Sequence, residues 1–162
     1  ALNQVGQSFG MALSAGDLNG DGYADLVLGT PIDNQAAAAQ VFVMFGHEGP
    51  YAAQVSSAAL DGSVGFTVEA HTGGGFALAA DGDLNSDGFD DLIIGEPRPG
   101  TGIAPGGGYR VVLGSAAPFA ASVGVFDLDG TDGYVTGSVL AAYDGSLGGS
   151  LDFVGDINGD GY

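Results

Sequence analysis

An acidic loop followed by a short apolar run occurs twice in this chain and begins a third time. This repeat limits the possible folds more than any other feature. Residues 17–31 read DLNGDGYADLVLGTP, and residues 83–97 read DLNSDGFDDLIIGEP. The loop starts again at residues 156–162 as DINGDGY, so successive loops are 66 and 73 residues apart. A tandem repeat of this length predicts one supersecondary unit used several times, each burying a face against its neighbour.

Each unit reads as four short strands joined by turns. Residues 41–46 repeat as 109–114, and residues 60–68 repeat as 128–136. Apolar and β-branched residues fill these segments, glycines separate them, and no longer window has a helical apolar period. Four-stranded units at this spacing predict an all-β fold of antiparallel propeller blades. The predicted strands lie near residues 10–15, 25–29, 40–46, 64–69, 75–81, 91–95, 108–113 and 133–136.

The charge balance is strongly acidic. The chain has 20 acidic residues, two arginines and no lysine, which gives a formal net charge of −18. Such a surface repels phosphate backbones and anionic headgroups, so we expect neither nucleic-acid partners nor direct membrane insertion. The absence of cysteine excludes disulfides and thiolate metal sites. The many carboxylates need cations to neutralise them, either diffuse salt or bound metal.

The first acidic loop has the spacing of an oxygen-donor metal site. Oxygen-bearing side chains fall at its positions 1, 3, 5 and 9, and Gly22 at position 6 permits a sharp reversal. The carbonyl of position 7 is then free to join them. Calcium prefers six to eight hard oxygen ligands, which such a loop supplies together with water. The predicted ligands are Asp17, Asn19, Asp21, the Tyr23 carbonyl and Asp25.

The second loop repeats this set, and the third repeats part of it. The predicted ligands of the second calcium are Asp83, Asn85, Asp87, the Phe89 carbonyl and Asp91. The third loop offers Asp156, Asn158, Asp160 and the Tyr162 carbonyl. It lacks position 9, so we expect it to bind weakly or only after completion by other residues. Asp, Asn and Gly are also common turn residues, but their recurrence at identical spacing favours calcium.

The residues after each loop distinguish it from a helix–loop–helix calcium site. Such a site needs a glutamate at position 12, followed by a helix. Here position 12 is Leu28 or Ile94, within an apolar run typical of a strand. Both loops are therefore predicted to be β-hairpin loops.

These motifs resemble the FG-GAP repeat of integrin α-chain propellers and of many bacterial surface and secreted proteins. The name-giving Phe-Gly is residues 9–10, and the Gly-Ala-Pro position is held by residues 29–31 and 95–97, which read GTP and GEP. The Asp-x-Asn-x-Asp-Gly loop between them matches the calcium site of the family. The resemblance implies four-stranded blades, calcium in hairpin loops on one rim, and a role in adhesion, ligand binding or scaffolding.

The resemblance also implies the extent of each unit. We expect a first blade at residues 1–70, a second at 71–143 and the start of a third at 144–162. Closed propellers have four to eight blades, so we expect this chain to be part of a longer one or to complete its blades from a partner. The second unit departs from the pattern, since it has Gly75-Phe76 where Phe-Gly is expected.

Three residues of types that often act in catalysis or metal binding are predicted to have neither role here. Ser8 lies in a G-x-S-x-G pattern, but a nucleophile elbow needs a helix after it, and here an acidic loop follows. His47 and His71 are the only histidines. Both fall in predicted loops, and we expect them to be solvated.

The remaining charged groups are given local roles. Asp33 and Glu96 follow the second strand of their units, and we expect them to be surface carboxylates rather than outer groups of the metal rim. Arg98 and Arg110 are the only fixed cations. We expect each to pair with a local carboxylate, with an acidic or carbohydrate ligand as the alternative.

The sequence therefore favours a binding module over an enzyme. The leading hypothesis is a calcium-binding propeller segment that contacts a protein or glycan, outside the cell, at the cell surface or in the periplasm. A second hypothesis is a structural subunit of a larger surface or filamentous assembly, in which further blades or copies of the chain are the partners. A third is an accessory propeller of a secreted polysaccharide lyase or phospholipase, although the chain is nearly without His, Lys and Arg.

Overall fold

The computed structural model describes residues 10–30, 39–70, 74, 77–97, 107–124, 127–137, 147–155 and 157–158. Within these ranges the chain is built from strands and one turn of 3-10 helix, η1 (Ser57–Ala59), so it holds no helix that could cross a membrane. The strands are β1 (Ala12–Gly16), β2 (Asp25–Thr30), β3 (Ala39–Met44), β4 (Gly65–Ala70), β5 (Leu78–Gly82), β6 (Asp91–Glu96), β7 (Gly108–Val112), β8 (Ser122–Val123) and β9 (Gly133–Gly137).

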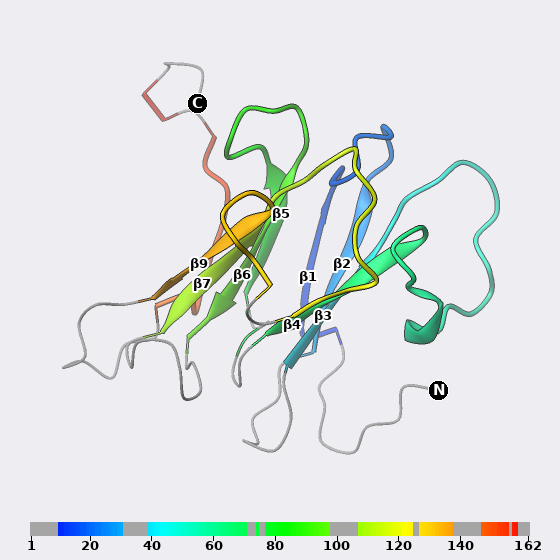
Figure 1. Cartoon of the computed structure of the whole chain (residues 1–162), viewed down its shortest axis with the longest axis horizontal. Helices are drawn as coiled ribbons and strands as arrows, with labels where there is room; N and C mark the ends of the chain where they lie inside the picture. The colour runs from blue at the N-terminus through cyan, green and yellow to red at the C-terminus, as the bar shows by residue number, and fades with distance from the viewer. Residues whose placement is uncertain are drawn as a thin grey trace.

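The strands form two sheets, one for each repeat, as predicted. The first sheet has the order β1-β2-β3-β4-β8, and the second has the order β5-β6-β7-β9. The four strands of each repeat pair antiparallel with their sequence neighbours, which is the meander of a propeller blade. We call β1–β4 blade 1 and β5, β6, β7 and β9 blade 2. The two blades lie side by side, with β1 against β5 (Figure 1).

The hydrophobic core lies between the two blades. Strand alternation places Val27, Val43 and Phe66 of blade 1 on the face toward blade 2, and all three are fully buried. Leu92 and Ile94 of blade 2 belong to the same buried cluster. Each blade therefore hides an apolar face that it could not bury alone, as expected of stacked repeats.

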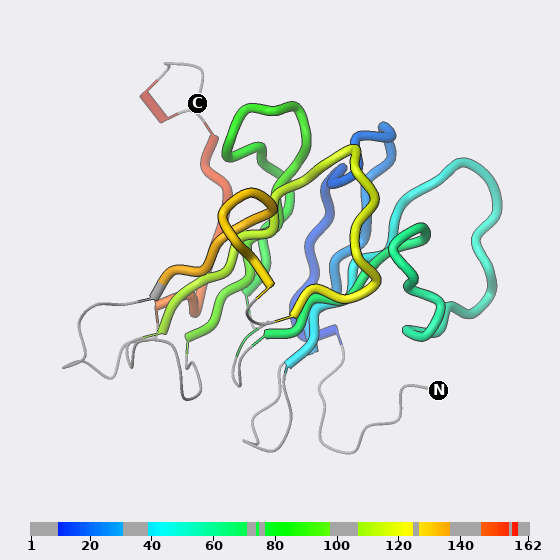
Figure 2. The backbone as a smooth tube through the Cα atoms, viewed as in Figure 1, coloured from blue at the N-terminus to red at the C-terminus, as the bar shows by residue number. Residues whose placement is uncertain are grey.

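The connection between β7 and β9 crosses from blade 2 to blade 1. In Figure 2 this yellow segment leaves β7 and runs along the outer edge of the first sheet, beside β4. It forms β8 there, parallel to β4, and the Thr67 amide donates to the Ala121 carbonyl at 3.0 Å. The sequence did not predict β8, because a two-residue strand has no alternation to reveal it.

Candidate metal centres

The first acidic loop, between β1 and β2, is folded by its own carboxylates. Asp17 accepts hydrogen bonds from the backbone amides of Asp21 (3.0 Å) and Gly22 (2.8 Å). Asp21 accepts from the Tyr23 amide at 2.9 Å and from the Asn19 side-chain amide at 2.9 Å. Gly22 has a φ of 87°, which provides the reversal predicted for position 6. The predicted donor oxygens of positions 1, 3 and 5 are thus gathered by one tight turn.

Asp25, at position 9, is the buried member of the set. Its side chain is fully buried, and its two carboxylate oxygens accept from the backbone amides of Leu18 and Gly46, each at 2.9 Å. The pKa of Asp25 is raised to about 6, mainly because the carboxylate is buried; the two hydrogen bonds oppose this rise, and the negative charges of Asp21 and Asp17 add to it. The carboxylates of Asp17 and Asp21 therefore add to the cost of ionising Asp25.

The second loop, between β5 and β6, reproduces this arrangement. Asp83 accepts from the amides of Asp87 (3.1 Å) and Gly88 (2.8 Å), and Asp87 accepts from the Phe89 amide at 3.1 Å. Asp91 is buried and accepts from the amides of Leu84 (2.7 Å) and Gly114 (2.8 Å). Burial raises the pKa of Asp91, with Asp87 and Asp83 adding to the effect. Both loops lie at the same end of their sheets, at the top of Figure 1.

The donor set fits calcium, although no ready cluster of acids is present. Among the described residues, no group of three or more Asp, Glu or His side chains is arranged to hold a metal ion. Position 3 of each loop is an asparagine, and the carboxylate at position 9 accepts hydrogen bonds from backbone amides. Each hydrogen-bonded carboxylate oxygen keeps a second lone pair, and every available donor is a hard oxygen. A cation bound here would also offset the negative charges of Asp21 and Asp17, which add to the effect of burial on the pKa of Asp25.

The third loop lies mostly outside the described residues. Asp156, Asp160 and Tyr162 fall there, while Asn158 is described and exposed. The prediction of a weak third site therefore stays a prediction.

A residue that the sequence did not single out links the two loops. Asp90 of the second loop accepts a hydrogen bond from the Asp17 amide at 2.8 Å, and its own amide donates to the Asp17 carbonyl at 3.1 Å. The corresponding residue of the first loop is Ala24. This difference, between two loops that match at positions 1, 3, 5 and 9, was the only signal in the sequence.

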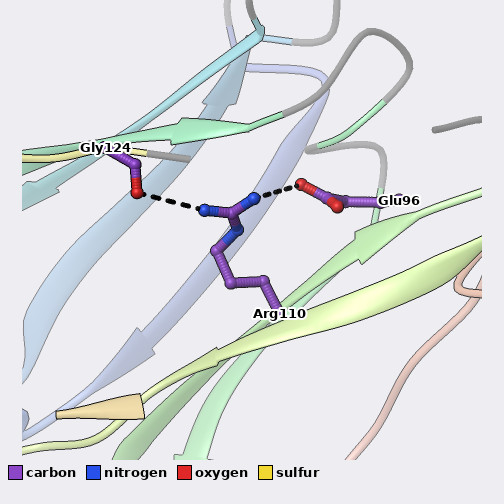
Figure 3. A network of polar contacts seen from close by, with 3 residues as sticks. All are labelled: Glu96, Arg110 and Gly124. Atoms are coloured by element: carbon purple, nitrogen blue, oxygen red, sulfur yellow. Dashed lines mark hydrogen bonds and ion pairs between the residues drawn. The ribbon is translucent and has the colours of Figure 1, made fainter. Parts of the chain in front are cut away.

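The prediction that Glu96 is a surface carboxylate is wrong. Glu96 and Arg110 are both fully buried and form an ion pair at 3.2 Å. The Arg110 guanidinium also donates to the Gly124 carbonyl at 3.3 Å, so it joins β6 and β7 to the end of β8 (Figure 3). The local pairing expected for Arg110 is confirmed. Alternation places both side chains on the face toward blade 1, which closes over them.

The other candidates are exposed or not described. His47 is exposed, as predicted, and its ring contacts the tilted ring of Tyr51 with ring centroids 4.4 Å apart. Ser8, Asp33, His71 and Arg98 lie outside the described residues.

Tandem four-stranded antiparallel sheets, each with an acidic loop between its first two strands, define a repeat protein of the propeller-blade class. The chain is an FG-GAP repeat protein. The family model described as "FG-GAP repeat" matches residues 9–44 and 74–113, which hold the first three strands and the acidic loop of each blade.

Several integrin α-chains are similar to this chain. Integrin alpha-7 of Rattus norvegicus is 36% identical over 96 residues, covering 58% of this chain and 8% of that protein. Integrin alpha-3 of Cricetulus griseus is 33% identical over 102 residues, covering 61% and 9%. Integrin alpha-E of Mus musculus is 33% identical over 162 residues, covering 94% and 13%. The chain thus spans only a small part of the length of these relatives.

Proposed function

We propose that this chain is a calcium-binding propeller segment that serves in adhesion, through contacts with a protein or glycan ligand. One observation carries the proposal. Two loops in different blades gather the same oxygens by the same hydrogen bonds, and each sets a buried carboxylate of raised pKa beside two further carboxylates. Repetition of an electrostatically unfavourable arrangement is best explained by a cation that each loop binds.

The proposed role of the cation is structural. Asp17, Asn19, Asp21, Asp25 and the Tyr23 carbonyl would hold it in blade 1, and the matching groups of the second loop would hold it in blade 2. Calcium would neutralise each cluster and fix the hairpin between two strands, so that metal binding adds to folding stability. Because Asp90 bonds to the backbone of Asp17, order in one loop supports order in the next.

Kinship supports the adhesive role and the location. The similar proteins are named as integrins, and we extend to this chain a place outside the cytoplasm, either extracellular, at the cell surface or periplasmic. We propose binding rather than catalysis because the chain holds two histidines and two arginines but no lysine. We keep residues 1–70, 71–143 and 144–162 as the proposed repeat units.

Thermal unfolding with and without calcium tests the metal. Excess chelator should lower the melting temperature markedly, since a ligand at about 100 times its Kd stabilises by about 2.7 kcal/mol per site. Asp21→Ala and Asp87→Ala should each remove part of the calcium response. Asp61→Ala is the matched control, because Asp61 is an exposed turn carboxylate outside both loops. A melting curve unchanged by chelator would overturn the proposal.

A second candidate role, as a subunit of a larger assembly, is favoured by an exposed apolar face. Leu13 and Leu26 are 61% and 43% exposed. They lie on the side of blade 1 opposite to the core, since Val27 between Leu26 and Leu28 faces blade 2. Sedimentation of the pure chain at increasing concentration separates the two roles. Association lost in Leu26→Ser would support the assembly, and a monomer throughout would exclude self-assembly through this face.

A further inference from the structure

The outer edges of the two blades differ. The last strand of blade 1, β4, pairs with β8 along its outer edge, with Thr67 opposite Ser122 and Val68 opposite Val123. In the described part of the chain, β9 is the last strand of blade 2 and pairs only with β7. An open strand edge presents amides and carbonyls that can pair with another strand.

The two edges have the same backbone geometry. Residues 60–68 correspond to 128–136, so Thr67 matches Val135. Gly65 and Gly133 open the two strands with φ values of 144° and 151°. The turn before each strand closes with an equivalent hydrogen bond, Gly62 amide to Gly65 carbonyl at 2.8 Å and Gly130 amide to Gly133 carbonyl at 2.9 Å. The register that directs the Thr67 amide outward is therefore repeated at Val135.

Neighbouring residues of blade 2 are open where those of blade 1 are covered. Leu18 is fully buried and its carbonyl accepts from the Ser115 amide, whereas the matching Leu84 is 43% exposed. Phe66 is fully buried and stacks on Phe119 at 4.4 Å, whereas the matching Tyr134 is 41% exposed. In blade 1 both covering residues come from the loop that carries β8.

Residues 147–155 already lie where a following blade would begin. A side chain at Gly16 would collide with the Ala80 carbonyl of the next repeat, and a side chain at Gly82 would collide with the Phe153 ring. Gly82 matches Gly16, and Phe153 matches Ala80, by the spacing of the acidic loops. The contact between blades 1 and 2 is thus continued on the far side of blade 2, which argues for another repeat as the occupant rather than an unrelated protein.

We propose that the outer edge of β9 accepts a short parallel strand from a following FG-GAP repeat. The strand would come from the loop before the fourth strand of that repeat, as β8 does here. The Val135 amide would donate to it as Thr67 donates to Ala121, and an aromatic residue of the same loop would cover Tyr134. Within this chain the matching segment is Gln54-Val55, which is exposed in the loop before β4. The inference does not depend on calcium.

The test extends the full chain with a copy of its own sequence. Because Tyr162 matches Phe89, residues 90–137 appended after Tyr162 would complete a third repeat in phase. Amide exchange followed by NMR should show the Val135 amide slowed by roughly tenfold relative to the chain without the extension, approaching Thr67. The matched control carries Val123→Pro in the appended copy only, which should return Val135 to fast exchange and leave Thr67 protected.

Three results would overturn the proposal. One is an appended repeat that folds, as judged by slow exchange in its own strands, while Val135 still exchanges fast. Another is an extension that stays unfolded, since the open edge and Leu84 would then not suffice to order a repeat. The last is protection of Val135 in the unextended chain that rises with protein concentration, which would assign the edge to a second copy.

Discussion

Blades 1 and 2 share a backbone plan but differ in the chemistry at one pair of positions. Thr30 and Phe42 of blade 1 correspond to Glu96 and Arg110 of blade 2. Thr30 donates its hydroxyl to the Gln40 carbonyl at 2.8 Å, whereas Glu96 and Arg110 form a buried ion pair enclosed by the neighbouring blade. The comparison teaches that loop and turn residues define the repeat, while positions between blades vary with what encloses them.

Removing one member of the ion pair should have the largest effect. Glu96→Ala leaves the Arg110 guanidinium buried without its carboxylate, and we expect a loss of about 3–5 kcal/mol in the free energy of unfolding. Urea denaturation measures it. The double variant Glu96→Thr with Arg110→Phe gives blade 2 the residues of blade 1 and should lose clearly less. An equal loss in the double variant would show that the pair is not what matters at these positions.

The second largest difference in stability between the blades should come from truncating the matched leucine in each loop. Leu18→Ala creates a cavity in the core and should cost about 3 kcal/mol, whereas Leu84→Ala removes a half-exposed side chain and should cost less than about 1 kcal/mol. Thermal or urea unfolding of both variants checks the difference. Equal costs would mean that Leu18 is not covered by blade 2 in solution.

The buried aspartates predict an unusual pH dependence without calcium. The pKa of Asp25 is raised to about 6, so the folded state holds this proton more tightly than the unfolded state. Its stabilising contribution is full below about pH 4 and is lost as the pH rises through 6. In chelator, the melting temperature should therefore rise as the pH falls from 7 to 5.

Two comparisons isolate the aspartates in that experiment. Asp61 and Asp129 have a lowered pKa through hydrogen bonds from their turns, so their contribution is lost only below the range tested. Asp25→Asn cannot titrate and should show a smaller rise. With saturating calcium the trend should reverse, because the metal needs ionised carboxylates. A melting temperature that falls between pH 7 and 5 in chelator would contradict the assignment.

The smallest effect should come from position 4 of the two loops. Ser86 has a φ of 59°, the left-handed region that costs a non-glycine residue energy, and Gly20 holds the same position in blade 1 with a φ of 71°. Ser86→Gly should stabilise by about 0.5 kcal/mol, since relief of strain exceeds the added chain entropy only slightly. The reverse exchange, Gly20→Ser, should destabilise. Matched calorimetry of both variants sharpens the comparison of the loops.

Most of the fold was predictable because it rests on local patterns. The apolar runs after Asp25 and Asp91 predicted β2 and β6 to within one residue, and glycine spacing located the turns. The reversal at Gly22 followed from loop chemistry alone. These features depend on a few adjacent residues, so the sequence carries them directly.

What the sequence did not reveal depends on contacts between repeats. In the sequence, Asp90 is one of several carboxylates in an acidic loop. Its hydrogen bond with the backbone amide of Asp17 depends on the packing of one repeat against the other. Glu96 was assigned to the surface because carboxylates are rarely buried, and only the packing of blade 1 over Arg110 reverses that expectation. Strand β8 has a partner 55 residues earlier, Thr67, and nothing in its own two residues announces it.

Strand β8 also means that the spatial limits of a blade differ from the limits of its sequence repeat. A fragment that ends with β4 would lack the strand beside Thr67 and the ring that stacks on Phe66. A piece of the chain that keeps every strand of the first sheet therefore extends through β8, well into the next repeat. Neighbouring units of this chain therefore share structure. Duplication or deletion of one unit changes the strand and the ring that cover the last strand of the unit before it.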